Sequence, residues 1–284
     1  MIAFLGMGLL GSNFVKALLK KGEKVQVWNR TASKAKALES DGAVAFEQVK
    51  DAVKGAKYIH LTLKDDASVD EVLAHAKEGF EPGAIIIDHT TTSVPGAKER
   101  TAKWKAAGFQ YQHAPVFMGP QNAHDSTGFM LVSGDAALIN SIHDHLASMT
   151  GTLLDFGDEV GKAAGMKLIG NSFLISFVAG LSDSLSLARA LNISSEDALA
   201  LFDSWNPANM LRARANKITS KKYHEASWEL GMARKDTGLF IQSAEAAGTP
   251  LFVLPAIAKH MDNLIADGHG NDDWTIIGRD SVGN

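Results

Sequence analysis

The chain has 284 residues, of which 45% are hydrophobic and 21% are charged, and it contains no cysteine. This composition is that of an ordinary globular protein large enough for two domains, and a formal net charge of -4 argues against a nucleic-acid partner. Without cysteine there can be no disulfide, thiol nucleophile or thiolate metal site, which fits a reducing compartment, and we expect a cytoplasmic protein.

Residues 2 to about 155 alternate short β-rich runs with amphipathic helical stretches. The expected strands are, in chain order, IAFLG (2–6), KVQVW (24–28), YIHLTL (58–63), AIIID (84–88), YQHAPV (111–116), FMLVSG (129–134) and GTLLDF (151–156). Strands separated by helices indicate a mostly parallel sheet covered on both faces. We therefore predict an N-terminal α/β domain, a doubly wound Rossmann sheet, over residues 1–158.

The turn after the first strand has the spacing of a dinucleotide-binding loop. Gly6, Gly8 and Gly11 form G-x-G-x-x-G between a strand and a helix. The first glycine allows the tight turn, the second lets the backbone approach a pyrophosphate, and the third lets helix pack on strand. We expect the cofactor to bind the whole segment, Gly6, Met7, Gly8, Leu9, Leu10 and Gly11. The alternative is a glycine-rich turn that serves only chain reversal.

The end of the second strand predicts which dinucleotide binds. An NAD enzyme usually places an acid here for the ribose 2′-hydroxyl, whereas this chain offers Asn29, Arg30, Thr31 and Lys34. A guanidinium suits a 2′-phosphate because it donates two parallel hydrogen bonds. We predict NADP, against the alternative that Arg30 is a solvated surface charge.

Two further stretches fit the same cofactor. LTLKDD, with Leu63, lies at the end of a strand and is expected under the adenine side. DHTTTS presents Thr90 and Thr91 just beyond another strand, where a hydroxyl can reach the nicotinamide end. Turn chemistry and helix capping before Pro95 explain the threonines equally well.

After Asp158 the pattern becomes helical, and we assign residues 159–284 to an all-α domain. Residues 160–191 read as one helix, apolar nearly all round, which indicates burial in a second domain or a subunit interface. Its longest apolar run, residues 168–182, is only 15 residues and contains Asn171. That is short of the roughly 20 residues of a membrane span, so no membrane is expected.

Lys167 lies in the middle of this helix, in the run GKAAGMKLIGN. An unpaired lysine in an apolar setting loses hydration or its proton. Asn171 is four residues later and so shares its helix face. The pair could act in a cleft, with Lys167 giving a proton to a carbonyl oxygen while hydride arrives at carbon. The competing interpretation is a lysine that extends to solvent along the helix side.

These motifs together resemble the β-hydroxyacid dehydrogenase family, which includes 3-hydroxyisobutyrate dehydrogenase, tartronate semialdehyde reductase and glyoxylate/succinic semialdehyde reductase and is 6-phosphogluconate dehydrogenase-like. The resemblance covers nearly the whole chain. It rests on FLGMGLLGSNF, DHTTTS, HAPV, GKAAGMKLIGN, RKDTGL and ADGHGNDDW, in the family's order.

The resemblance implies that Lys167 is the catalytic lysine and that Asn171 is its partner in substrate binding. It also implies that Lys235 reaches over the cofactor near the nicotinamide and that Asp236 helps hold that segment. Residues 159–284 are then the domain that binds substrate and mediates dimerisation, in a homodimer or homotetramer. The alternative for Lys235 is a surface ion pair. The implied reaction is NADPH-dependent reduction of a semialdehyde or an oxo acid to a hydroxyacid.

One loop departs from the family pattern. Where the family usually has Ser-Gly-Gly after APV, to bind the substrate carboxylate, this chain has Phe117, Met118 and Gly119 followed by Pro120. Imine reductases, a related branch, have bulky apolar residues here but generally lack the lysine. We therefore keep an imine or bulky apolar ketone or aldehyde as an alternative substrate, filling of the core as an alternative role for Phe117 and Met118, and a non-catalytic NADP-binding module as an alternative function.

Metal chemistry is not expected from this sequence. No H-E-x-x-H pattern occurs, and His143 and His145 are two residues apart, on different sides of a helix.

Overall fold

The computed structural model describes residues 1–283 and contains two compact units, Met1–Asn171 and Ser172–Asn284. The two units meet in sequence within one helix, α8 (Lys162–Ala190). The domain boundary expected between residues 158 and 159 lies just before this helix begins and stays a prediction.

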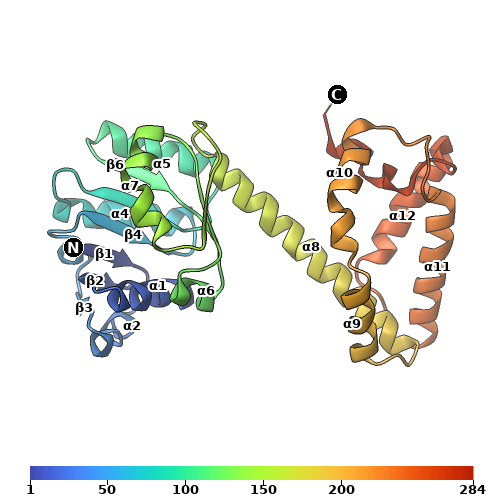
Figure 1. Ribbon diagram of the computed structural model, residues 1–284, viewed down its shortest axis with the longest axis horizontal. Helices are drawn as coiled ribbons and strands as arrows, with labels where there is room; N and C mark the ends of the chain where they lie inside the picture. The colour runs from blue at the N-terminus through green and yellow to red at the C-terminus, as the bar shows by residue number, and fades with distance from the viewer. Residues whose placement is uncertain (284) are drawn as a thin grey trace. The chain divides into compact units, whose positions relative to one another are not determined.

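A six-stranded parallel sheet forms the centre of the first unit, in the order β3-β2-β1-β4-β5-β6 (Figure 1). This is the Rossmann strand order, so the predicted fold class is confirmed. The strands are β1 (Ile2–Leu5), β2 (Val25–Trp28), β3 (Val44–Ala45), β4 (Tyr58–Leu61), β5 (Ile85–Asp88) and β6 (Gln110–His113). The two-residue edge strand β3 is too short to give a sequence pattern and was not predicted.

The last three strands form a second sheet of their own, β7-β8-β9, rather than extending the first. They are β7 (Val116–Phe117), β8 (Phe129–Val132) and β9 (Thr152–Asp155), with β7 antiparallel to β8. The stretch YQHAPV is therefore not one strand, because β6 ends at His113 and β7 begins after Pro115. Proline has no N–H to donate to a ladder, which favours a strand end there.

Alternating residues of the parallel strands build two cores, one on each face of the sheet. Phe4 packs with residues of α1 and α7, whereas the next residue, Leu5, packs with residues of α3 and α4. Such two-sided burial explains the continuous hydrophobic runs. The helices of this unit are α1 (Leu9–Lys20), α2 (Ala32–Lys36), α3 (Val49–Ala52), α4 (Asp66–Ala76), α5 (Val94–Ala106), α6 (Pro120–Asp125) and α7 (Ala136–Ala147).

The second unit is helical, as predicted. Besides most of α8 it contains α9 (Ser195–Ser204), α10 (Leu211–Ser220), α11 (Leu230–Ala246) and α12 (Leu254–Leu264). Ser194 caps α9, since its hydroxyl accepts a hydrogen bond from the Asp197 N–H. The buried carboxylate of Asp183, on α8, accepts the backbone N–H groups of Phe252, Val253 and Leu254 at the start of α12.

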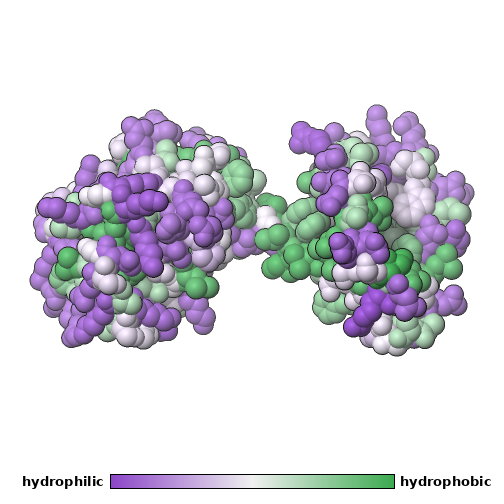
Figure 2. Space-filling model, turned by 60° about the horizontal axis from the view of Figure 1, so that its bottom comes forward, coloured by the Kyte–Doolittle hydropathy of each residue, from purple (hydrophilic) through white to green (hydrophobic). Residues whose placement is uncertain are grey.

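Helix α8 has 29 residues and leaves much of its apolar surface uncovered within the chain. Figure 2 shows hydrophobic side chains gathered along it. The large apolar residues exposed there are Leu168, Ile169, Phe173, Leu174, Ile175, Phe177 and Val178. By length and composition α8 could cross a membrane, which the 15-residue run had not suggested, but one such helix is weak support for a span. Within α8, the carboxylate of Asp183 accepts a hydrogen bond from the Phe252 N–H just before α12.

Candidate active site

The glycine-rich turn between β1 and α1 is fixed by contacts that leave no room for side chains. Gly6 has φ +101°, and a Cβ there would lie 2.2 Å from the Thr62 carbonyl oxygen. A Cβ on Gly11 would lie 1.9 Å from the Gly6 carbonyl oxygen, and the Thr62 hydroxyl donates to that same oxygen at 2.8 Å. Two of the three glycines are therefore required by packing of β1, α1 and β4.

Gly8 is different, because a Cβ there would meet no atom within 4 Å. It is the N-cap of α1, in an extended conformation that any residue adopts, so the fold does not demand glycine. The open space lies at a helix N-terminus, whose first-turn amides have no partner within the helix. Open backbone with free N–H donors fits a pyrophosphate, and Leu9, Leu10 and Gly11 supply those amides. The Met7 N–H instead donates to Asn29 Oδ1 at 2.9 Å.

A cavity of about 390 Å³ opens between this turn, the end of β2 and the start of α4. Three of the predicted residues, Arg30, Thr31 and Lys34, line it and are solvent-exposed. Asn29 also lines it, but its amide acts within the protein, since its nitrogen donates to the Thr31 carbonyl oxygen at 3.0 Å. Asn29 thus links the glycine turn to the end of β2 and shapes the cavity.

The cavity also has a wall that sequence reasoning found only in part. The stretch LTLKDD was expected there and contributes Thr62, Leu63 and Lys64, but the lining also includes Trp28, Ser68, Glu71, Val72 and His75. The signal for the α4 residues was the carboxyl end of β4, because neighbouring parallel strands end at the same edge of the sheet.

Thr90 and Thr91 have different environments. Thr90 is buried, its hydroxyl accepts the Leu63 N–H at 2.9 Å, and its own N–H donates to Asp88 Oδ1 at 2.9 Å. Thr91 is exposed. Thr90 therefore ties the end of β4 to the end of β5, and a contact of either threonine with nicotinamide stays a prediction.

A series of hydrogen bonds among largely buried polar side chains holds the turn after β5 that carries Thr90. Asp88 is fully buried and accepts a hydrogen bond from the Tyr111 hydroxyl at 2.7 Å. Arg100, also buried, donates to that hydroxyl at 3.1 Å and to Asp66 at 2.6 Å. Burial and the neighbouring Asp88 carboxylate raise the pKa of Tyr111. These groups fix the backbone that presents Thr90, and their separation in sequence gave no signal of it.

Lys167 and Asn171 lie together on α8, as their spacing predicts. The Lys167 ammonium donates to Asn171 Oδ1 at 3.1 Å, and only 9% of the lysine is exposed. Burial lowers the pKa of Lys167. A partly desolvated ammonium with a lowered pKa is better matched to proton transfer near neutral pH than an exposed one.

The loop that departs from the family pattern lies directly against this pair. The Phe117 ring centroid is 4.2 Å from the Lys167 nitrogen, and Met118 is partly buried against the core. The Gly119 N–H, one of the amides that a carboxylate could use, donates to Asn122 Oδ1 at 2.9 Å. Backbone donors in this loop are therefore partly occupied within the protein.

Lys235 belongs to the second unit, on α11, where it forms an ion pair with Asp236 at 3.0 Å and is largely exposed. This is the surface pairing that the sequence left open, and its place over the cofactor stays a prediction. In the part of the chain that the structure describes, no group of three or more histidine or acidic side chains is arranged to hold a metal ion.

Comparison with known proteins agrees with this geometry. Residues 1–157 match the family described as the NAD binding domain of 6-phosphogluconate dehydrogenase. Residues 159–279 match the C-terminal domain of NADPH-dependent reductive aminase-like proteins.

Individual relatives span several activities. The chain is 26% identical to 3-sulfolactaldehyde reductase of Escherichia coli over 97% of its own length and 94% of that protein. It is 29% identical to the human cytokine-like nuclear factor N-PAC over 98% of its length, and it spans only 51% of N-PAC. An imine reductase from Myxococcus stipitatus in complex with NADP+ has the same fold, with a TM-score of 0.89, 23% identity and coverage of 98% and 99% of the two chains.

Proposed function

Because the chain belongs to the β-hydroxyacid dehydrogenase family, with an NAD binding domain of the 6-phosphogluconate dehydrogenase type, we propose that it is an NADPH-dependent reductase of a small carbonyl compound. The observation that carries the proposal is the Lys167–Asn171 pair on α8, in which a buried Lys167 ammonium donates to Asn171 Oδ1 at 3.1 Å. A cytoplasmic location fits the lack of cysteine.

In the proposed mechanism, bound NADPH would supply a hydride from nicotinamide C4 to the carbonyl carbon. The first-turn amides of α1 and the open space at Gly8 would hold its pyrophosphate. The Lys167 ammonium donates a proton to the carbonyl oxygen as negative charge develops there, and Asn171 fixes the direction of that ammonium. In the reverse direction neutral Lys167 accepts the proton, and the lowered pKa of Lys167 increases the fraction of lysine that is neutral and able to do so.

The preference for NADPH over NADH is assigned to Arg30, with Thr31 and Lys34 beside it in the same cavity. No acidic side chain at the end of β2 opposes a 2′-phosphate.

We expect Arg30→Ala to raise KM for NADPH about 10- to 100-fold while KM for NADH changes little, since a charge-assisted hydrogen bond contributes roughly 1.5–3 kcal/mol. Steady-state kinetics with both cofactors measure the ratio. Lys36→Ala is the matched control, because Lys36 is a basic residue at the end of α2, the short helix that begins just after Arg30. It pairs with Glu47 and lies outside the cavity. An unchanged NADPH/NADH ratio in Arg30→Ala would refute the assignment.

A second candidate substrate class stands beside this proposal. The family resemblance favours a semialdehyde or an oxo acid reduced to a hydroxyacid. The second candidate, an imine or a bulky apolar ketone or aldehyde, is favoured by the Phe117 ring against Lys167 and by the engaged amide of Gly119. These contacts put apolar surface where the family's loop binds a carboxylate.

NADPH oxidation with a substrate panel tests the proposal. The panel contains glyoxylate, succinic semialdehyde, a bulky apolar aldehyde and a cyclic imine. Reduction of at least one carbonyl compound supports the proposed reductase, and reduction of the cyclic imine alone supports the second candidate instead. Tight NADPH binding without oxidation by any of them would instead support a non-catalytic NADP-binding module.

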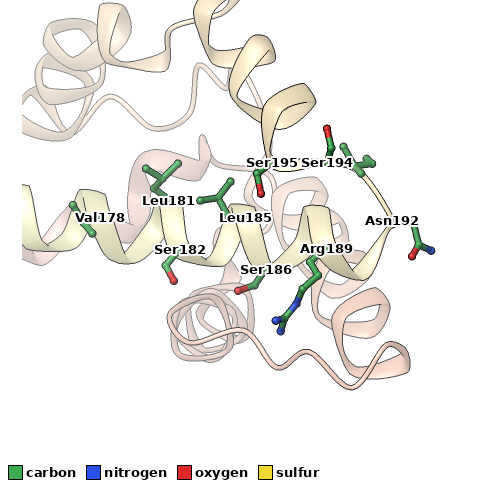
Figure 3. Close-up of a pocket in the computed structure, with 10 residues that line it drawn as sticks. Val178, Leu181, Ser182, Leu185, Ser186, Arg189, Asn192, Ser194 and Ser195 are labelled. Atoms are coloured by element: carbon green, nitrogen blue, oxygen red, sulfur yellow. The ribbon is translucent and has the colours of Figure 1, made fainter.

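We further propose that the partner of this chain is a second copy of itself, seated on α8. Phe173, Leu174 and Ile175 are each more than half exposed and point about 100° apart around the helix. Further along α8, Leu181 and Leu185 line a hollow with Ser194 and Ser195 (Figure 3). Apolar surface on all sides of one helix exceeds what a monomer usually exposes and suits an isologous interface.

The change Ile175→Asp is expected to reduce the solution mass from at least two chains of 30.3 kDa to one, because a buried charge would oppose association. Light scattering coupled to size-exclusion chromatography measures it. Leu239→Asp makes the same kind of change, an exposed apolar side chain to a carboxylate, at a residue of α11 that is 54% exposed. It should leave the mass unchanged. A monomeric native protein would contradict the proposal.

A further inference from the structure

The Phe117 ring occupies space on α8 that is open only because residue 170 is glycine. A Cβ placed on Gly170, inside α8, would lie 2.3 Å from Phe117 Cζ and 2.8 Å from its Cε1. The tip of the ring therefore rests directly on the helix backbone. Glycine is disfavoured inside a helix relative to alanine, and this contact gives a physical reason for glycine here.

The same ring presents its face to the ammonium of Lys167. The nitrogen lies 4.2 Å from the ring centroid and 3.1 Å from Asn171 Oδ1. No ion pair of the Met1–Asn171 unit includes Lys167, and burial is the cause of its lowered pKa. The ring face, which carries negative quadrupole potential, is thus the electrostatic partner of the ammonium beside one amide oxygen.

We propose that Phe117 is a positioning residue, whose ring, seated on Gly170, holds the ammonium of Lys167 by a cation–π contact. The inference rests on the proposed function for its consequence, that the proton is delivered from a fixed point between Phe117 and Asn171. A serine in this place, as in the family's usual loop, has no ring face and could not make this contact.

The contact between the Phe117 ring and the ammonium should change the pKa of Lys167 in a definite direction. A cation–π contact stabilises the charged form, so it raises the pKa of Lys167 against the lowering caused by burial. Complete loss of the contact should lower that pKa further, by about 0.4–1.5 units for the usual strength of such contacts, and weakening the ring's negative face should lower it by part of that amount. Carbonyl reduction needs the protonated lysine, so the rate, which falls as pH rises through this pKa, should begin to fall at lower pH.

The test replaces Phe117 with 3,5-difluorophenylalanine, which keeps nearly the same shape and burial but weakens the quadrupole. The pKa of Lys167 is read from the 13Cε chemical shift of the ammonium-bearing carbon in 13C-labelled protein, assigned by its loss in Lys167→Met. We expect a lower midpoint in the fluorinated protein and in Gly170→Ala, whose methyl group displaces the ring. Phe129→Leu is the matched control, since Phe129 pairs with Phe117 in the sheet.

An unchanged midpoint in the fluorinated protein would overturn the inference, and so would a midpoint that moved equally in Phe129→Leu. The titration does not require turnover. If the midpoint shifts as expected but no carbonyl compound is reduced, the positioning role stands and the proposed function fails. If a carbonyl compound is reduced but the midpoint does not shift, the proposed function stands and the positioning role fails.

Discussion

Replacing Lys167 with alanine is expected to lower kcat for carbonyl reduction by about 100- to 10,000-fold, the usual contribution of a general acid. KM for NADPH should change little, because the residues that hold the dinucleotide lie at the glycine turn and around Arg30. Stopped-flow NADPH oxidation at saturating substrate measures the loss. The isosteric variant Lys167→Met should be equally impaired, which separates loss of the ammonium from loss of packing.

Lys162→Ala is the matched control for this prediction. Lys162 begins the same helix and is exposed, so its removal tests the general loss of a positive charge from α8. A Lys167→Ala protein that kept more than a tenth of the native rate would show that the proton comes from elsewhere.

The glycine turn should give two opposite results at Gly11 and Gly8. Gly11→Ala places a methyl group 1.9 Å from the Gly6 carbonyl oxygen. Overpacking of that severity costs about 3 kcal/mol, and Tm should fall by about 6–12 °C. Gly8→Ala meets no atom within 4 Å, so its Tm should stay within about 2 °C of the native value.

Gly8→Ala should nevertheless weaken NADPH binding about 10- to 100-fold, because its methyl group enters the space through which the pyrophosphate approaches. Thermal unfolding and fluorescence titration with NADPH measure the two effects separately. Native NADPH affinity in Gly8→Ala would mean that the open space at Gly8 holds no cofactor.

The sequence predicted those parts of the site whose residues lie close together in the chain. Gly6, Gly8 and Gly11 follow a strand and open a helix, and Lys167 and Asn171 are one helical turn apart, so their arrangement follows from spacing alone. The α/β and all-α halves were likewise visible as a change of period after Asp158.

Contacts between distant segments could not be predicted in this way. The Phe117 ring reaches Gly170 only because β7 belongs to a second small sheet, which the single run YQHAPV concealed. The Tyr111 hydroxyl reaches Asp88 because β5 and β6 are neighbours in the sheet. Residue types alone do not state such pairings, since each depends on strand order and on where a strand ends.

Asn29 makes contacts within the protein that its sequence position did not predict. Its position at the end of β2 predicted contact with the cofactor, whereas its amide bonds to Met7 and Thr31. A short polar side chain at a strand end can serve either a ligand or the neighbouring turn, and the sequence does not decide between them.

The most direct test of the central claim is the fate of the hydride. NADPH deuterated at nicotinamide C4, on the transferring face, is incubated with the native protein and the carbonyl compound that it reduces fastest, and the alcohol is examined by mass spectrometry and NMR. The account predicts one deuterium, on the former carbonyl carbon, formed at a rate that Lys167→Ala lowers by orders of magnitude. NADPH oxidation that places no deuterium in the product, or no oxidation with any carbonyl compound, would contradict it.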